Sequence, residues 1–367
     1  MNKFYKYILL LGGVLAVGLA VWYFQSIIAY VLISAVLSLI GAPVVQLLGK
    51  IRIKKFYLPK GLRAGLTLVL IWVAFITFFR IFVPLVASEA EKFSHLDSKT
   101  ILLTLQEPIN HIDALVNSIN INKESKFSTI NLLSQKIESI LNIGLFTDLF
   151  GSLANTITSV FIALFSISFI SFFFLKDESL FSDAILLLVP TKHEEATRRV
   201  LHSTKGLLMR YFVGICGQIS GIIILITTGL FAVGIDLQTC FVIAFFVGII
   251  NVIPYIGPLI GAIFGVFMGI ASKIQVLHAD QFVPLIIYIL LVYLVVHLID
   301  NILFQPLIFS SSVKAHPLEI FLVILVAGHL AGITGMLVAI PSYTVIRVFA
   351  KQFLNNFKVV KKLTEKI

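Results

Sequence analysis

The sequence predicts an all-α polytopic membrane protein with about eight transmembrane segments, two of them broken or re-entrant, and an external amphipathic helical region. Hydrophobic residues make up 59% of the 367 residues and charged residues only 13%, whereas an ordinary soluble domain has about 25% charged residues. Apolar runs of about 20 residues, long enough to span a bilayer as a helix, recur along the chain. Barrel-type alternation is absent, and backbone groups in lipid must bond within their own segment, so the runs are expected to be helices.

The apolar runs divide the chain into four regions. Residues 1–86 hold the first three transmembrane helices, 87–152 the external amphipathic region, 153–350 the transmembrane transport core with a cytoplasmic segment at 176–206, and 351–367 a basic cytoplasmic tail. The eight segments are expected at 7–24, 27–48, 64–86, 153–175, 207–234, 238–271, 283–308 and 318–350. The first is expected to be a retained span, because no small-residue cleavage site follows it.

The distribution of lysine and arginine sets the expected orientation. Residues 50–63 hold six basic residues and no acid, the tail holds five lysines and one acid, and residues 87–152 hold five lysines and eight acids. The positive-inside rule therefore places both termini in the cytoplasm, with an even number of crossings of a bacterial inner membrane. The net charge of +10 lies beside apolar runs rather than in a basic domain, so membrane lipids and not nucleic acid are the expected partner.

Two extramembrane stretches carry helical signals. Apolar residues recur at spacings of three and four within 105–119 and again within 130–140, which predicts two amphipathic helices. Their apolar stripe is expected to be buried in an intramolecular hairpin, on the membrane surface, or against a second subunit in a homo-oligomer. Thr191 and Glu194 have capping-box spacing, so a helix is expected to begin there and to run into the fifth span.

Two of the apolar segments are interrupted. Residues 238–271 are broken around Pro254, Gly257 and Pro258, and residues 318–350 by Gly332, Gly335 and Pro341. Each is either one kinked helix or a re-entrant hairpin, and an even number of crossings requires both to behave alike. Interrupted segments of this kind point to the translocation site of a transporter.

Polar residues inside the apolar segments are the candidates for function. Asn251 precedes the first break, where freed carbonyls together with Asn251 and Tyr255 would coordinate a polar solute or cation. The alternative is a conformational kink with Tyr255 packed at an interface. The second break, with Gly332 and Gly335, is assigned to the same pathway.

Asp300 is the ionisable residue of the seventh segment, where insertion costs about 3 kcal/mol. His297 lies three residues earlier, and a His–Asp pair on one helix face would carry a proton. The alternative places Asp300 in interfacial water near the end of the helix. Gln305 precedes Pro306, and the break there is expected to expose carbonyls to the pathway. His329 is a further candidate for proton coupling, although a lone histidine is often only hydrogen-bonded.

Other residues of the apolar segments suggest structural roles. Arg210 and Gln218 lie nearly on one face of the fifth segment, and Arg210 suits an interfacial anchor. Glycines along that segment suit close helix packing; they are Gly214, Gly217, Gly221 and Gly229. No nucleotide loop, zinc motif or nucleophile elbow occurs, so we expect no catalytic residue, no metal and no cofactor, and a protein that is not an enzyme.

At these motifs the chain resembles the autoinducer-2 exporter family of bacterial membrane proteins. The resemblance rests on Arg210-Tyr211 with Gln218, on the run from Asn251 to Ala262, on Asp300-Asn301, Gln305-Pro306 and His316-Pro317, and on the run from Gly328 to Pro341. Order and spacing agree over about residues 200–350. The resemblance implies an inner-membrane oligomer that exports a small polar signalling molecule, or in some members exchanges sodium for protons.

The chain departs from the family pattern near the expected binding region. The family commonly has a longer acid where Asp300 stands and a lysine where Leu307 stands, and its Gly-Lys turn is replaced by Ser310-Ser311-Ser312. His329 stands where a small residue is usual. We therefore expect a secondary transporter or exporter of an autoinducer-2-like solute, coupled to an ion or a proton. The alternatives are a sodium/proton antiporter and a non-transporting oligomeric membrane scaffold.

Overall fold

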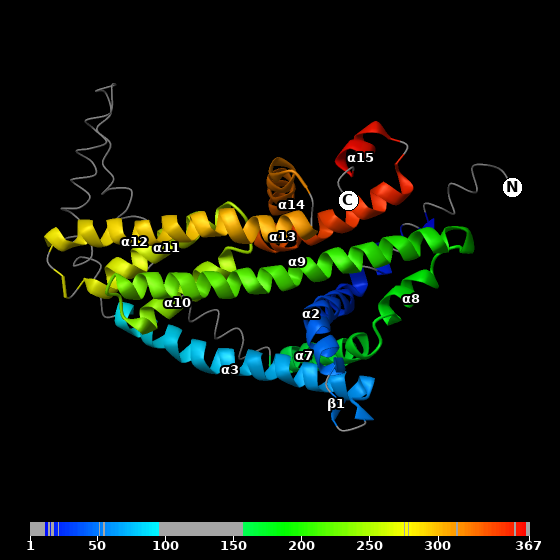
Figure 1. Cartoon of the computed structure of the whole chain (residues 1–367), viewed down its shortest axis with the longest axis horizontal. Coiled ribbons are helices and arrows are strands. Elements are labelled where there is room, and N and C mark those ends of the chain that lie inside the picture. The colour runs from blue at the N-terminus through cyan, green and yellow to red at the C-terminus, as the bar shows by residue number, and fades with distance from the viewer. Residues whose placement is uncertain are drawn as a thin grey trace. The chain divides into compact units, whose positions relative to one another are not determined.

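The computed structural model describes residues 12–13, 15, 18–20, 22–50, 52–53, 56–94, 157–274, 276–277, 279–312, 315–355 and 357–364. Half of the expected segment 7–24 and the whole region 95–152, with its two expected amphipathic helices, lie outside these residues. The described chain is built almost entirely of helices (Figure 1), which confirms the all-α class. It forms two compact units, Met1–Phe75 with Ala154–Lys205, and Ile76–Leu153 with Gly206–Ile367.

The first unit is formed by α2 (Gln25–Lys50), the first part of α3 (Lys60–Ser94), α7 (Ile157–Lys176), α8 (Leu180–Leu186) and the start of α9 (Thr191–Ala232). Gly41 allows α2 and α7 to approach closely, because a Cβ on Gly41 would lie 2.9 Å from Cδ2 of Leu175. Trp72 Nε1 donates a hydrogen bond of 2.9 Å to Ser168 Oγ. Strands β1 (Arg52–Ile53) and β2 (Phe56–Tyr57) pair antiparallel between α2 and α3, a short hairpin that the sequence analysis did not foresee.

Helix α9 begins at Thr191 and continues without interruption to Ala232, which confirms the predicted start. In the second unit it packs along α12 (Ala279–Ile299), a π-helical turn η1 (Asp300–Phe304) and α13 (Gln305–Ser312). Glycines of α9 make the contact close: Cβ atoms on Gly214, Gly221 and Gly229 would lie 2.5 to 2.8 Å from side chains of the facing helix. The expected glycine packing is confirmed at these three positions, whereas Gly217 has no atom within 4 Å.

The first broken segment is a helical hairpin of α10 (Leu237–Ile250) and α11 (Ile256–Lys273). Asp236 caps α10 by accepting a hydrogen bond of 3.0 Å from the amide of Thr239. The two helices run side by side, since the ring centroids of Phe246 and Phe264 are 3.9 Å apart. At 1.5 Å per residue the 14 residues of α10 rise about 21 Å, which is short of the roughly 30 Å hydrocarbon core.

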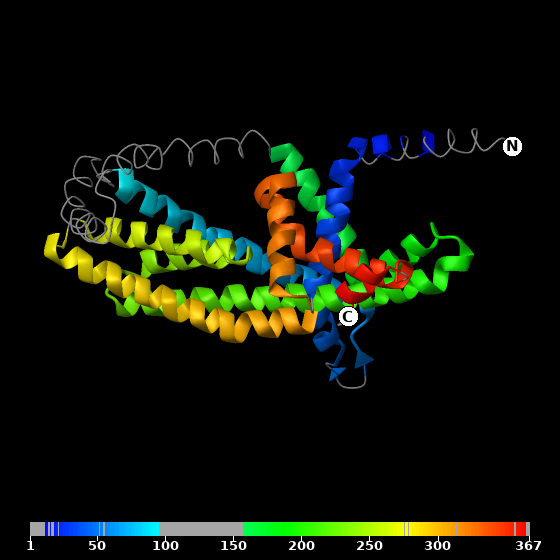
Figure 2. The same ribbon diagram turned by 90° about the horizontal axis from the view of Figure 1, so that it is seen from above.

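The second broken segment, α14 (Pro317–Phe353), is also a hairpin. Gly332 has a φ of +60° and Ala331 is non-helical, so the chain reverses there (Figure 2). The two arms meet along their length, and the hydroxyl of Tyr343 donates a hydrogen bond of 3.0 Å to Glu319. His316 and Pro317 begin the first arm, with Nδ1 of His316 accepting from the amide of Leu318. Both broken segments thus adopt the same form, as an even number of crossings requires.

Six described helices are long and apolar enough to cross a membrane, and two shorter apolar helices, Phe161–Lys176 and Leu237–Ile250, accompany them. Helix α14 is among the six as a 37-residue helix, but its reversal divides it into two antiparallel arms. Large apolar side chains lie on outward faces, for example Ile302 at 74% exposure and Leu330 at 78%. Such surfaces suit lipid as the solvent and agree with a multi-pass membrane protein.

Candidate functional site

Asp300 lies at the centre of a buried polar cluster in the second unit. Its side chain is in the π-helical turn η1, and the residue is only 2% exposed. The carboxylate accepts hydrogen bonds from the side-chain amides of Gln218 at 2.7 Å, Asn251 at 3.2 Å and Gln305 at 3.1 Å. Three amide side chains, from three segments of the chain, therefore meet at the carboxylate of Asp300.

The hydrogen-bond chemistry of this cluster is unusual for a buried charge. An ionised carboxylate only accepts, so each amide turns its NH₂ group toward Asp300 and its carbonyl oxygen elsewhere. Among the described residues the partners of this carboxylate are neutral, and no lysine, arginine or histidine side chain is bonded to it. The carboxylate of Asp300 therefore has three neutral donors and no cationic partner among the described residues.

A small, largely enclosed cavity lies beside the cluster. It has about 10 Å³ of space for the centre of a water-sized sphere, which is room for about one water molecule. Its lining includes three of the four members of the cluster, Gln218, Asn251 and Gln305, together with Tyr211, Ile215, Val252 and Pro254. No basic side chain lines it, so it suits a cation or an uncharged polar group and disfavours an anion.

Tyr211 adds a hydroxyl to this cavity. The residue is 2% exposed, and its hydroxyl oxygen is buried with no hydrogen-bond partner in the structure. A buried hydroxyl without a partner costs about 1–3 kcal/mol, and such groups are expected to meet a water or a ligand. Tyr211 is therefore a candidate site residue that was not predicted from the sequence. The signal was available, since Tyr211 and Gln218 are two helical turns apart on α9.

The turn of the first hairpin positions Asn251 and Pro254. Asn251 is the C-cap of α10, and Tyr255 precedes α11 with a φ of +69°, a left-handed conformation that non-glycine residues rarely adopt. Gly257 is required here, because a Cβ on it would clash with the carbonyl oxygen of Ile250. Strain of this kind in a tight turn is typical of sites where the backbone approaches a ligand.

The π-helical turn positions Asp300 and Gln305. The amide of Gln305 bonds to the carbonyl of Asp300, which is five residues earlier instead of four. The expected break at Gln305-Pro306 is wrong, because the helix continues from α12 through η1 into α13. The wider turn accommodates Pro306, which has no amide to donate.

Several predicted site residues lie away from the cluster. Tyr255 is 42% exposed and its ring packs edge-on against Phe321 of α14, at 5.6 Å between centroids. This contact joins the two hairpins and matches the alternative of packing at an interface. Pro258 is half-buried within α11. Gly332 and Gly335 form the turn of α14, where a Cβ on Gly335 would clash with the carbonyl oxygen of Ala327.

The two histidines assigned to coupling are also separate from Asp300. His297 is exposed, and its Nε2 lies 2.9 Å from the side-chain amide of Asn301, so the expected His297–Asp300 pair is not formed. His329 is exposed near the turn of α14. Arg210 is exposed and donates to the carbonyl of Gly206, whereas Gln218, expected beside it in a structural role, is buried and bonded to Asp300.

A second buried acid lies elsewhere in this unit, on α3. Glu89 is 2% exposed and accepts a hydrogen bond of 3.0 Å from the hydroxyl of Thr239 on α10. The neighbouring Ser88 and Gln238 are also hydrogen-bonded to each other. The end of α3 is thus bonded to the start of the first hairpin.

Comparison with known proteins gives a consistent assignment. The profile of the AI-2E family transporter matches residues 11–355. The chain is 25% identical to YueF of Bacillus subtilis, named as a transport protein, over 345 residues that cover 90% of this chain and 84% of YueF. It is 28% identical to YrrI of the same organism, also named as a transport protein, over 54% of each chain. Over 56 residues it is 41% identical to PerM of Escherichia coli, named as a permease, which covers 15% of this chain and 16% of PerM.

Proposed function

Because this chain belongs to the AI-2E transporter family, it is a multi-pass membrane transport protein, and we propose that it exports a small polar solute of the autoinducer-2 type through the site around Asp300. The proposal includes secondary transport across the bacterial inner membrane, with both termini in the cytoplasm, and assembly as a homo-oligomer. The single observation that carries it is the buried Asp300, held by three neutral amides beside a cavity with an unpartnered tyrosine hydroxyl.

The chemistry of the site supports an uncharged polar solute. The amide groups and the Tyr211 hydroxyl offer both donors and acceptors, and such groups recognise hydroxyl and carbonyl oxygens of a neutral ligand. An anionic solute would be repelled by Asp300, which has no basic partner among the described residues.

The size of the cavity supports alternating access. Room for about one water is too little for an organic solute, so a solute would enter only after the surrounding elements separate. The two hairpins are the candidates for this motion, because the first carries Asn251 and the second contacts the first at Tyr255. Separation of this kind is the usual form of transport between broken helices.

Coupling to a cation or proton is assigned to Asp300. Its burial makes a lone negative charge costly, so binding of a proton or a cation there would be linked to the conformation of the site. The expectation that His297 and His329 take part is retained only as a secondary hypothesis, since neither is bonded to Asp300 in the structure.

Uptake of labelled autoinducer-2 into inside-out proteoliposomes tests the proposal. We expect saturable uptake that depends on an imposed proton gradient and is lost in Asp300→Ala. A signal no higher than in protein-free liposomes, with the protein folded and inserted, would rule out this solute.

A sodium/proton antiporter is the alternative with a specific observation in its favour. The cavity is the size of a single small ligand, and carboxylate, amide and hydroxyl oxygens are hard ligands that suit a small cation. Collapse of a pH gradient on addition of sodium, without any solute, would favour this alternative. Equal gradients with sodium and with choline would exclude it.

The scaffold alternative places function in assembly through residues 88–150. A deletion of 97–150 spares the bond between Glu89 and Thr239, so the second unit keeps its described contacts. A transporter is expected to keep solute uptake in this variant, whereas a scaffold would show no uptake even in the full-length chain and would lose its cellular role on the deletion.

A further inference from the structure

A basic hollow lies at the end of the described chain, where α14 meets α15 (Lys358–Leu363). Its volume is about 450 Å³, and its lining consists of Lys351, Asn355, Lys358, Lys361, Lys362 and Thr364. Four of these six residues are lysines, and none is acidic. We propose that this C-terminal basic hollow binds the phosphate headgroup of an anionic phospholipid.

Three of the four lysines of the hollow have no acidic partner among the described residues. Lys358, Lys361 and Lys362 are exposed, and no ion pair in the described part of the chain joins them to a carboxylate. Their spacing of three and four residues places them on one face of α15, where like charges destabilise a short helix. A phosphate between them removes this repulsion and adds charge-assisted hydrogen bonds.

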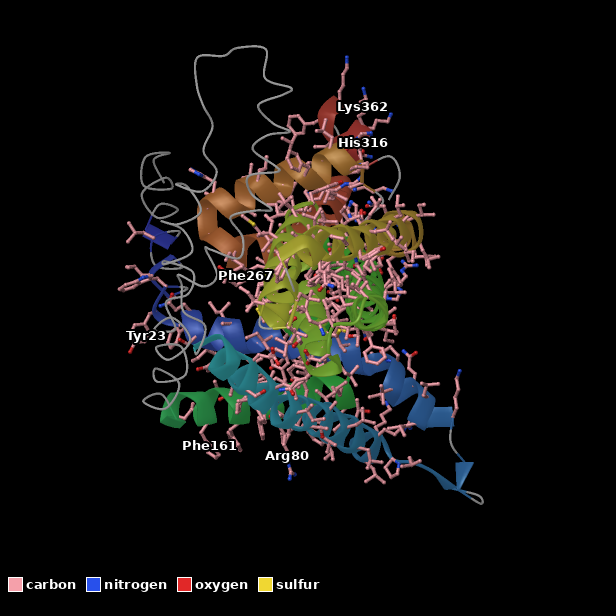
Figure 3. All side chains as sticks on the ribbon, turned by 90° about the vertical axis from the view of Figure 1, so that its left-hand side faces the viewer. Tyr23, Arg80, Phe161, Phe267, His316 and Lys362 are labelled. Atoms are coloured by element: carbon pink, nitrogen blue, oxygen red, sulfur yellow. The ribbon has the colours of Figure 1, made fainter. Side chains whose placement is uncertain are left out.

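The fold keeps the lysines together. The hydroxyl of Thr364 is buried and donates a hydrogen bond of 2.7 Å to the carbonyl of Val360, which closes the end of α15. The amide of Phe357 bonds to the carbonyl of Leu354, so the link between α14 and α15 is a tight turn. Figure 3 labels Lys362 on this last helix, where nitrogen-tipped side chains project away from the ribbon.

Apolar side chains beside the hollow identify the source of the phosphate. Leu354 is 43% exposed and Phe357 is 63% exposed, and both lie in the sequence between Lys351 of α14 and the lysines of α15. They follow directly on α14, which is apolar enough for the bilayer. Exposed apolar groups next to clustered lysines at the end of such a helix are the arrangement that binds anionic lipid, because acyl chains and headgroup are then contacted together.

The test measures binding of fluorescent phosphatidylglycerol to the full-length protein in neutral detergent, with phosphatidylcholine of the same acyl chains as the comparison. We expect clear preference for phosphatidylglycerol, weakened at high salt because the contacts are partly exposed. The variant Lys358→Gln/Lys361→Gln/Lys362→Gln should bind about 100-fold more weakly, from a contribution of about 1 kcal/mol per lysine.

Matched variants separate charge in the hollow from charge elsewhere and from folding. Lys192→Gln/Arg198→Gln/Arg199→Gln also removes three positive charges, two of them ion-paired on α9, and should bind as tightly as wild type. Lys358→Arg/Lys361→Arg/Lys362→Arg keeps the charge and should retain binding.

Three outcomes would overturn the proposal. One is equal binding of the two lipids, and another is unchanged phosphatidylglycerol binding in the triple glutamine variant. The third is that soluble glycerol 3-phosphate displaces phosphatidylglycerol with the same affinity as the lipid itself, and that Phe357→Ser does not weaken phosphatidylglycerol binding. The ligand would then be a soluble phosphate compound.

Discussion

Replacing Tyr211 by phenylalanine removes one hydroxyl from the candidate site and leaves the ring in place. The hydroxyl is buried and unpartnered, so the substitution removes a polar group that costs about 1–3 kcal/mol when it is not hydrogen-bonded. We expect the free energy of unfolding in the absence of solute to stay the same or to rise by about 1 kcal/mol. The same substitution should weaken transport, because the bound solute then loses its hydrogen bond to the hydroxyl of Tyr211.

The size of the transport defect follows from the strength of one neutral hydrogen bond. A contribution of about 0.5–1.5 kcal/mol corresponds to a rise in KM of about 2- to 10-fold. A larger loss would indicate that the hydroxyl acts on the coupling step rather than on solute binding alone. The measurement is concentration-dependent uptake in proteoliposomes together with thermal unfolding of the same preparation.

Tyr293 provides a matched control within the same unit. Its hydroxyl is also buried without a partner, but it lies against Gly265 in the apolar core and does not line the cavity beside Asp300. Tyr293→Phe should therefore have the same effect on stability and none on KM. If both variants transport alike, or if Tyr211→Phe lowers stability and leaves uptake intact, the hydroxyl of Tyr211 is structural and the reasoning is wrong.

Two further predictions concern the first hairpin. Gly257→Ala should destabilise the protein by about 1–3 kcal/mol and abolish uptake, because its Cβ would clash with the carbonyl of Ile250. The control Gly217→Ala on α9 should be nearly neutral, because open space surrounds that position. Equal melting temperatures for the two variants would contradict the hairpin geometry. Thr239→Val should cost about 1–3 kcal/mol of unfolding free energy, because it removes a hydroxyl within hydrogen-bond distance of both buried Glu89 and the N-cap Asp236. Wild-type stability would show that these two contacts contribute nothing.

The sequence predicted the helical segments because a span in lipid needs about 20 mostly apolar residues. Such a run must form a helix, since its backbone groups have to bond within the segment. It could not decide between kinked spans and hairpins, since the proline and glycine residues around Tyr255 and around Gly332 are compatible with both. The reversal depends on local φ values and on contacts between the arms, such as that of Tyr343 with Glu319, which lie 24 residues apart.

The candidate site was predicted residue by residue but not as a group. Asp300 and Asn251 were selected because polar groups are costly in lipid, yet their contact spans 49 residues and the contact with Gln218 spans 82. The pairing with His297 expected from regular helical spacing is not formed, because His297 contacts Asn301 while Asp300 is bonded to amides of α9 and of the first hairpin. Only the three-dimensional packing of α9 against the first hairpin and η1 brings the cluster together.

The most direct test of the account is gradient-driven uptake of labelled autoinducer-2 by Asp300→Asn, measured beside wild type and Asp300→Ala. Asparagine keeps an oxygen that can accept from Gln218 but carries no ionisable group, so it preserves much of the geometry and removes the charge. The account predicts that Asp300→Asn loses gradient-driven uptake but still exchanges labelled for unlabelled solute without a gradient. Full gradient-driven uptake by Asp300→Asn, with loss in Asp300→Ala, would contradict the coupling role of Asp300.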